Sequence, residues 1–303
     1  MTKSGLGPHV VGQRVVVRRV LPGETGPTGG PAMTDVLGIC ESWGDGLAVV
    51  RREDDSVVEI AIADIVSGKP VPPRPSARLR VSAREAESHA APLWPSVVRA
   101  ALGDWELRTE PYPVGRLLKR ANSCLAMGDP GLPFTDAVER VLAFYDALGR
   151  DPLAQVEVGS EVEQAFLDAG WTDVPGGEAD LMLGSLARAR RAVARPPADG
   201  VVTVAVDGAR IEATATRAGE QAGVVHAAVD GDWLGVHGLA VEPGHRRHGV
   251  ATALMDAVLE HGAERGATTL WLHVETDNDP ARSFYEQLGL VTHHTCRYLS
   301  PAT

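Results

Sequence analysis

The sequence contains few cysteines. Its 303 residues include three, Cys40, Cys124 and Cys296, which are widely spaced and odd in number. Such a set predicts neither a disulfide framework nor a zinc site, and it fits the reducing environment of a cytoplasm. We therefore expect a cytoplasmic protein that binds no metal.

Long hydrophobic runs and an excess of positive charge are also missing. No apolar stretch approaches the length of a membrane span, and the N-terminus lacks the hydrophobic core of a signal peptide. Asp and Glu number 40 against 29 Lys and Arg, so the formal charge is −11. This acidic balance argues against a nucleic-acid surface. Neither a membrane nor a nucleic acid is therefore expected as a partner.

Two proline-rich segments divide the chain. Residues 67–75 are incompatible with a helix or a central strand and predict a semi-rigid linker, and residues 195–200 form a second break. The predicted segments are a small β-domain at 8–68, a linker at 69–77, a middle segment at 78–194 and a C-terminal domain at 200–303.

Short β-like runs fill the first segment. They cover residues 14–20, 34–42, 46–52 and 57–62, and residues 43–46 have the composition of a turn. This pattern predicts a small antiparallel barrel of SH3-like type, which could dock a partner or cap the rest of the chain.

The C-terminal domain contains the most informative stretch. An apolar strand ends at Val241, turns through Pro243 and Gly244, and opens directly into a helix with apolar residues at helical spacing. The N-terminus of a helix leaves four amides unpaired and attracts anions such as a pyrophosphate. The turn lacks the lysine of a P-loop and the three spaced glycines of a dinucleotide fingerprint.

The pattern Arg-x-x-Gly-x-Ala, formed by Arg246, Gly249 and Ala251, resembles the pyrophosphate loop of the GNAT superfamily of N-acetyltransferases. The order strand, loop, helix, strand, helix, strand is similar as well. Asn278 ends the next strand and Tyr285 follows seven residues later, as in that superfamily. The resemblance covers about residues 200 to 300.

This resemblance implies an α/β (α+β) fold with a central mixed, mostly antiparallel sheet. In the middle segment, strands are expected at 105–108, 120–124, 155–158 and 181–185, with helices at 135–148 and 160–169. Because this order repeats that of the C-terminal domain without its phosphate loop, we predict a tandem arrangement whose first GNAT-like half is degenerate. The run from Arg120 to Ser123 resembles actinobacterial GNAT proteins, some labelled N-acetylglutamate synthases or histone-type acetyltransferases.

The resemblance also implies acetyl-CoA as co-substrate and assigns residues to it. The strand would pair with the pantetheine arm, the loop would hold the pyrophosphate, and an asparagine would fix the coenzyme near the catalytic tyrosine. The residues expected to bind the coenzyme are Leu239, Ala240, Val241, Arg246, Arg247, His248, Gly249, Val250, Ala251 and Asn278.

Acetyl transfer from a thioester to an amine needs three groups. A backbone amide at a bulged strand end would polarise the carbonyl, and the phenol of Tyr285 would protonate the leaving thiolate. His237, expected on the same face of the strand as Leu239 and Val241, or His273, at the position of a catalytic Glu in several members of the superfamily, would accept the amine proton directly or through water. Each histidine could equally be a hydrogen-bonded core residue.

The acceptor stays open at this point. An amino acid such as glutamate would need a cation for its carboxylates, for which Arg217, Arg282 and Arg297 are candidates. A protein lysine or N-terminus would need an open acidic groove. A coenzyme A-binding sensor or scaffold is the non-enzymatic alternative, and a homodimer is among the assemblies considered.

Overall fold

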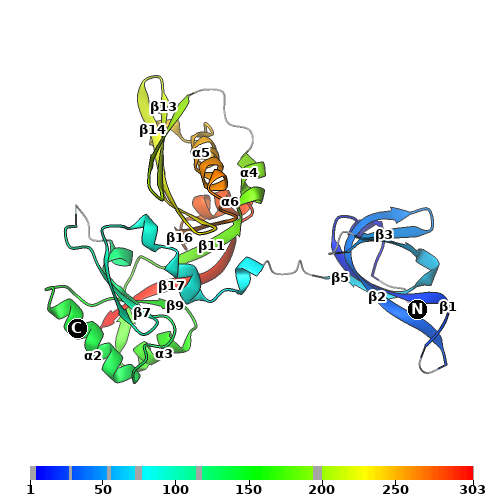
Figure 1. Cartoon of the computed structure of the whole chain (residues 1–303), viewed down its shortest axis with the longest axis horizontal. Coiled ribbons are helices and arrows are strands. Elements are labelled where there is room, and N and C mark those ends of the chain that lie inside the picture. The colour runs from blue at the N-terminus through cyan, green and yellow to red at the C-terminus, as the bar shows by residue number, and fades with distance from the viewer. Residues whose placement is uncertain are drawn as a thin grey trace. The chain divides into compact units, whose positions relative to one another are not determined.

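The computed structural model describes residues 5–26, 29–52, 56–71, 77–113, 118–193 and 200–302. The chain forms two compact units, Met1–Pro75 and Ser76–Thr303 (Figure 1). Residues 72–76 of the predicted linker and residues 195–199 of the second break lie outside the described residues. The four segments predicted from the sequence therefore stay a prediction.

The first unit is an all-β domain built on one five-stranded antiparallel sheet. Its strands are β1 (Arg14–Thr25), β2 (Pro31–Gly44), β3 (Leu47–Arg51), β4 (Val57–Ala61) and β5 (Ile65–Pro70), in the order β4-β3-β2-β1-β5, with short 3₁₀ turns η1 (Pro8–Val10) and η2 (Ile62–Asp64). Burial alternates at the start of β1, so that Val15 and Val17 join Val36, Val50 and Ile60 in one core.

All four strands predicted in this unit are confirmed, as is the turn at Asp45 and Gly46, both of which have positive φ. The expected start of the linker is wrong, because Ser67–Pro70 pair with β1 as part of β5. An edge strand tolerates the proline that a central strand would exclude.

The second unit contains a twelve-stranded sheet and six α-helices within the described residues. The strands are β6 (Val98–Leu102), β7 (Trp105–Thr109), β8 (Cys124–Leu125), β9 (Ala154–Glu157), β10 (Trp171–Asp173), β11 (Ala179–Ser185), β12 (Val201–Asp207), β13 (Arg210–Arg217), β14 (Glu220–Asp230), β15 (Trp233–Val241), β16 (Thr269–Glu275) and β17 (Val291–Pro301). The helices are α1 (Ala83–Ser88), α2 (Phe134–Asp146), α3 (Glu161–Asp168), α4 (Leu186–Val193), α5 (Val250–Glu264) and α6 (Asp279–Gln287), and the 3₁₀ turns are η3 (Ala77–Arg80), η4 (Ala91–Leu93), η5 (Lys119–Ala121) and η6 (Pro243–His245).

The sheet passes without interruption through the middle and C-terminal segments. Its order is β12-β13-β14-β15-β16-β11-β17-β9-β8-β7-β6, with β10 paired to β17. Strand β11 of the middle segment lies between β16 and β17 of the C-terminal segment and pairs with both. Figure 1 shows β17 reaching from the half with α5 toward the half with α2 and α3. Each segment thus completes the sheet of the other.

Helix α5 covers the sheet on the side of the main core. Leu254, Met255, Val258 and Leu259 recur at helical spacing, and all four are buried. Helix α4 packs beside α5 and adds Leu186 to the same cluster. Within the described segments, no helix combines the length and apolar character needed to cross a membrane.

Most elements expected in this unit are confirmed, whereas β6, β10 and α4 of the middle segment were not predicted. The strand predicted at 120–124 is wrong, because the chain there forms the turn η5 and a two-residue strand, β8. Helix α1 was not predicted from the sequence. It begins after Ser82, whose Oγ accepts a hydrogen bond from the amide of Glu85 at 3.1 Å.

Candidate active site

Strands β15 and β16 separate in the middle of the sheet. They pair in parallel only from Trp233 to Val236. Just beyond, His226 of β14 faces His237 while Val224 faces Ala240, so β15 contains a bulge. Gly238 adopts a φ of 62°, which a residue with a side chain rarely takes. Beyond Val236 the bulged edge of β15 has no β16 partner among the described residues, and its pairing with a pantetheine arm stays a prediction.

The bulge also corrects one prediction. His237 does not share a face with Leu239 and Val241, because the extra residue reverses the alternation of the strand. Leu239 and Val241 pack against the core beneath α5. His237 instead contacts the Trp94 ring, with the ring centroids 4.5 Å apart.

The turn after β15 leaves the first amides of α5 available. Gly249 stands at the N-cap of α5 with a φ of 77°, and no side chain caps the helix. Arg246 and His248 are exposed on this turn, and Arg246 Nε donates to the carbonyl of Val241 at 3.2 Å. Unpaired amides and adjacent cations are the donors that a pyrophosphate requires.

Replacement of Gly249 by leucine should weaken acetyl-CoA binding at least about tenfold, since a side chain at the helix N-terminus would block the approach of the phosphates. Gly266, at the other end of α5, also has a positive φ, 85°, and a Cβ added there would meet no atom within 4 Å. Gly266→Leu therefore imposes similar backbone strain away from the loop. Equal dissociation constants for the two variants by calorimetry would remove Gly249 from the coenzyme site.

A pocket of about 520 Å³ lies where β15 and β16 separate. Five of the predicted site residues line it: His237, Leu239, His273, Asn278 and Tyr285. Its wall also includes residues from the middle segment that the sequence did not single out, among them Leu93, Trp94, Lys119 and Arg120. The remaining predicted coenzyme residues, Ala240, Val241 and Arg246 to Ala251, are not part of this lining and continue from it along the strand and turn.

Tyr285 reaches the pocket from α6. Its side chain is 8% exposed, and among the described residues its hydroxyl makes no hydrogen bond. Burial raises the pKa of Tyr285 to about 12, so the phenol is protonated at neutral pH. Asn278 is the N-cap of α6, and its Oδ1 accepts from the amide of Ala281 at 3.2 Å. The Asn278 side chain thereby fixes the start of the helix that presents Tyr285.

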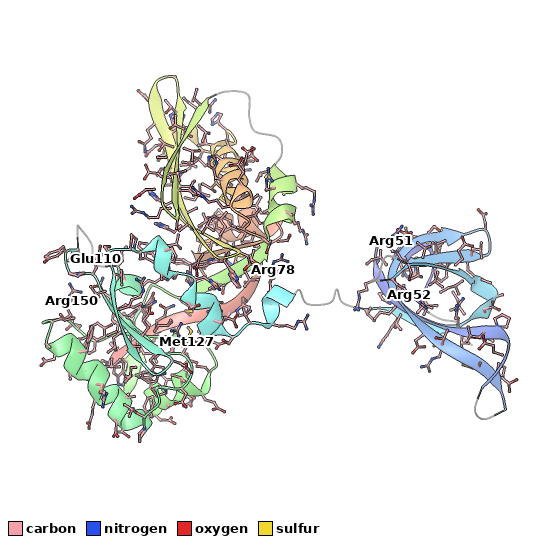
Figure 2. All side chains as sticks on the ribbon, in the orientation of Figure 1. Arg51, Arg52, Arg78, Glu110, Met127 and Arg150 are labelled. Carbon is pink, nitrogen blue, oxygen red and sulfur yellow. The ribbon has the colours of Figure 1, made fainter. Side chains whose placement is uncertain are left out.

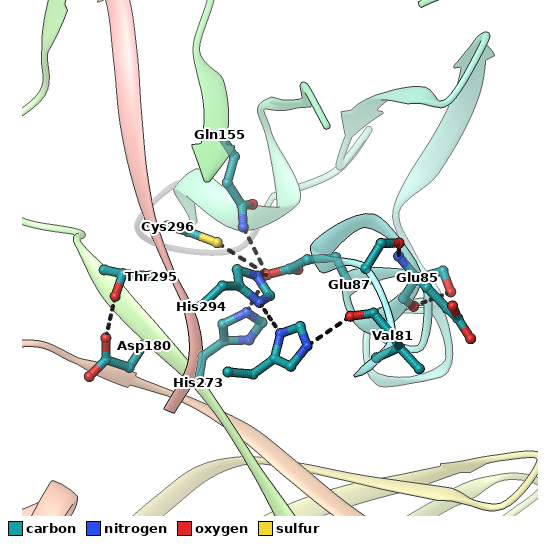
Figure 3. A network of polar contacts seen from close by, with 12 residues as sticks. Val81, Glu85, Glu87, Gln155, Asp180, His273, His294, Thr295 and Cys296 are labelled. Carbon is teal, nitrogen blue, oxygen red and sulfur yellow. Dashed lines mark hydrogen bonds and ion pairs between the residues drawn. The ribbon is translucent and has the colours of Figure 1, made fainter. Parts of the chain in front are cut away.

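His273 is held by a buried carboxylate, Glu87 of α1. His273 Nε2 lies 2.7 Å from Glu87 Oε1, and His294, Cys296 and Gln155 direct weaker contacts of 3.3 to 3.4 Å to the same oxygen (Figure 3). Burial by itself would raise the pKa of Glu87, but its electrostatic interaction and hydrogen bond with His273, the hydrogen bond with His294 and the charge of Arg120 hold that pKa well below the usual range. An ionised Glu87 selects the His273 tautomer with hydrogen on Nε2 and a lone pair on Nδ1.

Both candidate bases are neutral in the folded chain. Burial lowers the pKa of His273 to about 4, with a further lowering by Arg120 that Glu87 only partly offsets. Burial, His226 and Arg120 lower the pKa of His237 to about 4 as well. Each can therefore accept a proton at neutral pH, but each is a weaker base than a free imidazole.

The same buried cluster contains potential metal ligands. One ligand atom each from Glu87, His294 and Cys296 lies within 4.8 Å of the others. The three groups already contact one another through Glu87 Oε1, and burial with the Glu87 charge raises the pKa of the Cys296 thiol well above its usual value. A protonated thiol is a poor metal ligand, so the donor set favours a polar network.

The arginines considered for an acceptor carboxylate lie elsewhere. Arg282 pairs with Asp180 at 3.3 Å and Arg297 with Glu163 at 3.0 Å. Neither these two nor Arg217 lines the pocket, whereas Arg120 does. Sequence reasoning missed Arg120 because its run was interpreted as a strand.

Two sequence families match the chain. The Acetyltransferase (GNAT) family matches residues 188–290, and the Rv0428c N-terminal Sm-like domain matches residues 9–69. The GNAT match thus lies in the mixed α/β sheet of the second unit, and the Sm-like match covers the all-β sheet of the first. The expected GNAT fold is confirmed.

Individual relatives align over short stretches. The ribosomal protein bS18-alanine N-acetyltransferase of Escherichia coli K12 is 39% identical over 51 residues, 17% of this chain and 34% of the relative. The mycothiol acetyltransferase of Streptomyces avermitilis is 42% identical over 60 residues, 20% of each chain. The chain thus matches about a third or less of the length of these relatives.

A solved structure shares the fold over a larger part of the chain. The GCN5-related N-acetyltransferase from Kribbella flavida has a TM-score of 0.59 at 17% identity and covers 74% of this chain and 96% of its own.

Proposed function

We propose that the chain is an acetyl-CoA-dependent N-acetyltransferase that transfers the acetyl group directly to a primary amine. The observation that supports this most is the continuity of the site. The uncapped α5 N-terminus, the bulged edge of β15 and the pocket with Tyr285 and His273 follow one another along the separated strands. A long thioester with a diphosphate at its far end would match this succession.

Three groups of the chain would serve the transfer. The amine nitrogen attacks the thioester carbon, forming a C–N bond while the C–S bond breaks. A backbone amide at the Gly238 bulge is suited to receive the carbonyl oxygen, since its edge of β15 has no partner in β16. His273 Nδ1, oriented through Glu87, would take the amine proton. Tyr285 would deliver its phenolic proton to the leaving sulfur.

The acceptor belongs to the same proposal. The matched relatives include an enzyme named for a protein alanine and another named for mycothiol, so both peptide and small-molecule amines are considered. The resemblance to actinobacterial GNAT proteins adds an amino acid such as glutamate. A cytoplasmic location is proposed with this activity.

Release of free coenzyme A from acetyl-CoA across a panel of amines tests the function. We expect release that requires an amine and produces the acetylated amine in equal amount by mass spectrometry. Tight acetyl-CoA binding with no transfer to any amine would instead identify a coenzyme A-binding sensor.

A further inference from the structure

Arg120 is a cation in the pocket without a hydrogen-bond or ion-pair partner among the described residues. It lines the same cavity as His237, His273 and Tyr285. Its Nε atom is shielded from solvent and has no hydrogen-bond partner, and within the described segments no hydrogen bond or ion pair holds its guanidinium. A buried donor left unpaired destabilises the protein, and a guanidinium stays charged at any physiological pH. The guanidinium of Arg120 can therefore donate hydrogen bonds to a ligand.

The backbone of Arg120 is held in place. It lies in the turn η5, which is closed by hydrogen bonds from the amides of Ala121 and Asn122 at 3.1 and 3.0 Å. Asn122 Oδ1 also accepts from the amide of Glu110 at 2.9 Å, and Arg150 donates to Asn122 and to the carbonyl of Glu110. Figure 2 labels Glu110 and Arg150 on this part of the fold. Because the backbone is already fixed, only side-chain freedom is lost when the guanidinium binds an anion.

The neighbouring lysine is used differently. Lys119 donates to the carbonyls of Pro175 and Gly176 and lies over the ring of Tyr298, 5.7 Å from its centroid. The Lys119 ammonium group therefore already binds the loop at 175–176. Arg120, one residue later, has the planar donor arrangement that binds a carboxylate through two parallel hydrogen bonds.

The charge of Arg120 acts on the reacting end of the pocket. It lowers the pKa of both His237 and His273, and it helps to keep Glu87 ionised. Glu87 offsets part of this positive charge, yet it forms no ion pair with Arg120 within 4 Å, and its Oε1 already accepts from His273. The phosphate loop at Gly249 belongs to a different part of the site, the N-terminus of α5. The geometry therefore favours an anion on the acceptor.

We propose that Arg120 binds a carboxylate of the acceptor, and that the acceptor is an amino acid whose amine lies near His273. This inference rests on the proposed N-acetyltransferase function and narrows it. Lysine side chains of proteins, which have no carboxylate close to the amine, would be poor acceptors. A phosphate group close to an amine offers the same oxyanion chemistry and is distinguished by the experiment.

The test uses the full chain, acetyl-CoA, the twenty standard L-amino acids, their α-amides and O-phosphoethanolamine. At least one amino acid should exceed its own amide about 100-fold in kcat/KM, because the amide leaves the guanidinium unpaired. In Arg120→Gln this ratio should fall to about one, mainly through a higher KM for the amino acid, with Arg120→Lys in between. Lys119→Gln, which removes the same charge one residue earlier, should keep the ratio. The acetyl-CoA dissociation constant should not change in Arg120→Gln.

Several results would overturn the proposal. Arg120 would not bind a carboxylate if amino acids and amides were used equally, or if Arg120→Gln lost the same activity with both. Preference for O-phosphoethanolamine would replace the carboxylate by a phosphate. Absence of transfer to every amine would refute the enzymatic function itself. In that case calorimetry of amino acids with the coenzyme A-saturated chain still decides whether Arg120 binds them.

Discussion

Tyr285→Phe should lower kcat about 10²- to 10³-fold while leaving the acetyl-CoA dissociation constant within about twofold, because the hydroxyl acts on the sulfur only as the C–S bond breaks. The hydroxyl makes no hydrogen bond among the described residues, so its removal leaves no protein group unpaired. Burial raises the pKa of this phenol to about 12 and should also raise that of a thiol bound in the same pocket, which keeps proton transfer feasible. Single-turnover acetyl transfer and calorimetry separate the two effects.

Tyr298→Phe is the matched control. Tyr298 lines the same pocket, is buried, and loses the same atom in the substitution, but it comes from β17 rather than α6. We expect this variant to keep most of the wild-type kcat. If both variants lose activity equally, the pocket depends on buried hydroxyls in general, and Tyr285 is not the acid.

The C-terminal part of the site could be predicted because its signals are local. The loop at Gly249 and the spacing from Asn278 to Tyr285 lie within single strand–helix connections. Sequence periodicity then indicates the faces of α5 and α6. Unpaired amides and a capped helix result directly from such short patterns, and the structure places Tyr285 and Asn278 in one pocket.

The rest depends on contacts between distant parts of the chain. Glu87 and His273 are 186 residues apart, and α1 is a six-residue helix too short for a periodic signal. Strand β11 enters the sheet between two later strands, which no local pattern specifies. The turn at Arg120 replaces the expected strand because Asn122 bonds to Leu118 and Glu110, and these partners could not be paired from the sequence. The bulge at Gly238, which places His237 on the face opposite to the expected one, likewise involves the pairing of β15 with β14 and has no local sequence signal.

A second large effect is expected at Glu87, which we assign as a positioning residue for His273. Glu87→Gln keeps an oxygen that accepts from His273 Nε2 but removes the negative charge that stabilises the imidazolium formed during transfer. We expect kcat/KM to fall about 100-fold. The pKa of His273, about 4 in the wild-type chain, should fall further, since Glu87 raises it.

The pH profile distinguishes positioning from a structural role. In the wild-type chain His273 is neutral above its pKa of about 4. Lowering the pH from 8 to 5 should therefore not reduce kcat/KM with a midpoint at the pKa of a free imidazole. The remaining pH dependence should follow ionisation of the acceptor amine, which attacks only when neutral. A step near pH 6.5 in the wild-type profile would mean that an exposed histidine, and not His273, is the base.

Cys296→Ala is the control for Glu87→Gln. The Cys296 thiol is buried and contacts the same Glu87 oxygen at 3.4 Å, yet it does not line the pocket. If Glu87 acts through His273, Cys296→Ala should change kcat/KM by less than about threefold, since the loss of one weak contact leaves the stronger bond to His273 intact. Partial recovery in Glu87→Asp, which restores the charge, would support the assignment. Equal losses in Cys296→Ala and Glu87→Gln, with unchanged pH profiles, would reduce the network to a structural role and leave His237 or water as the proton acceptor.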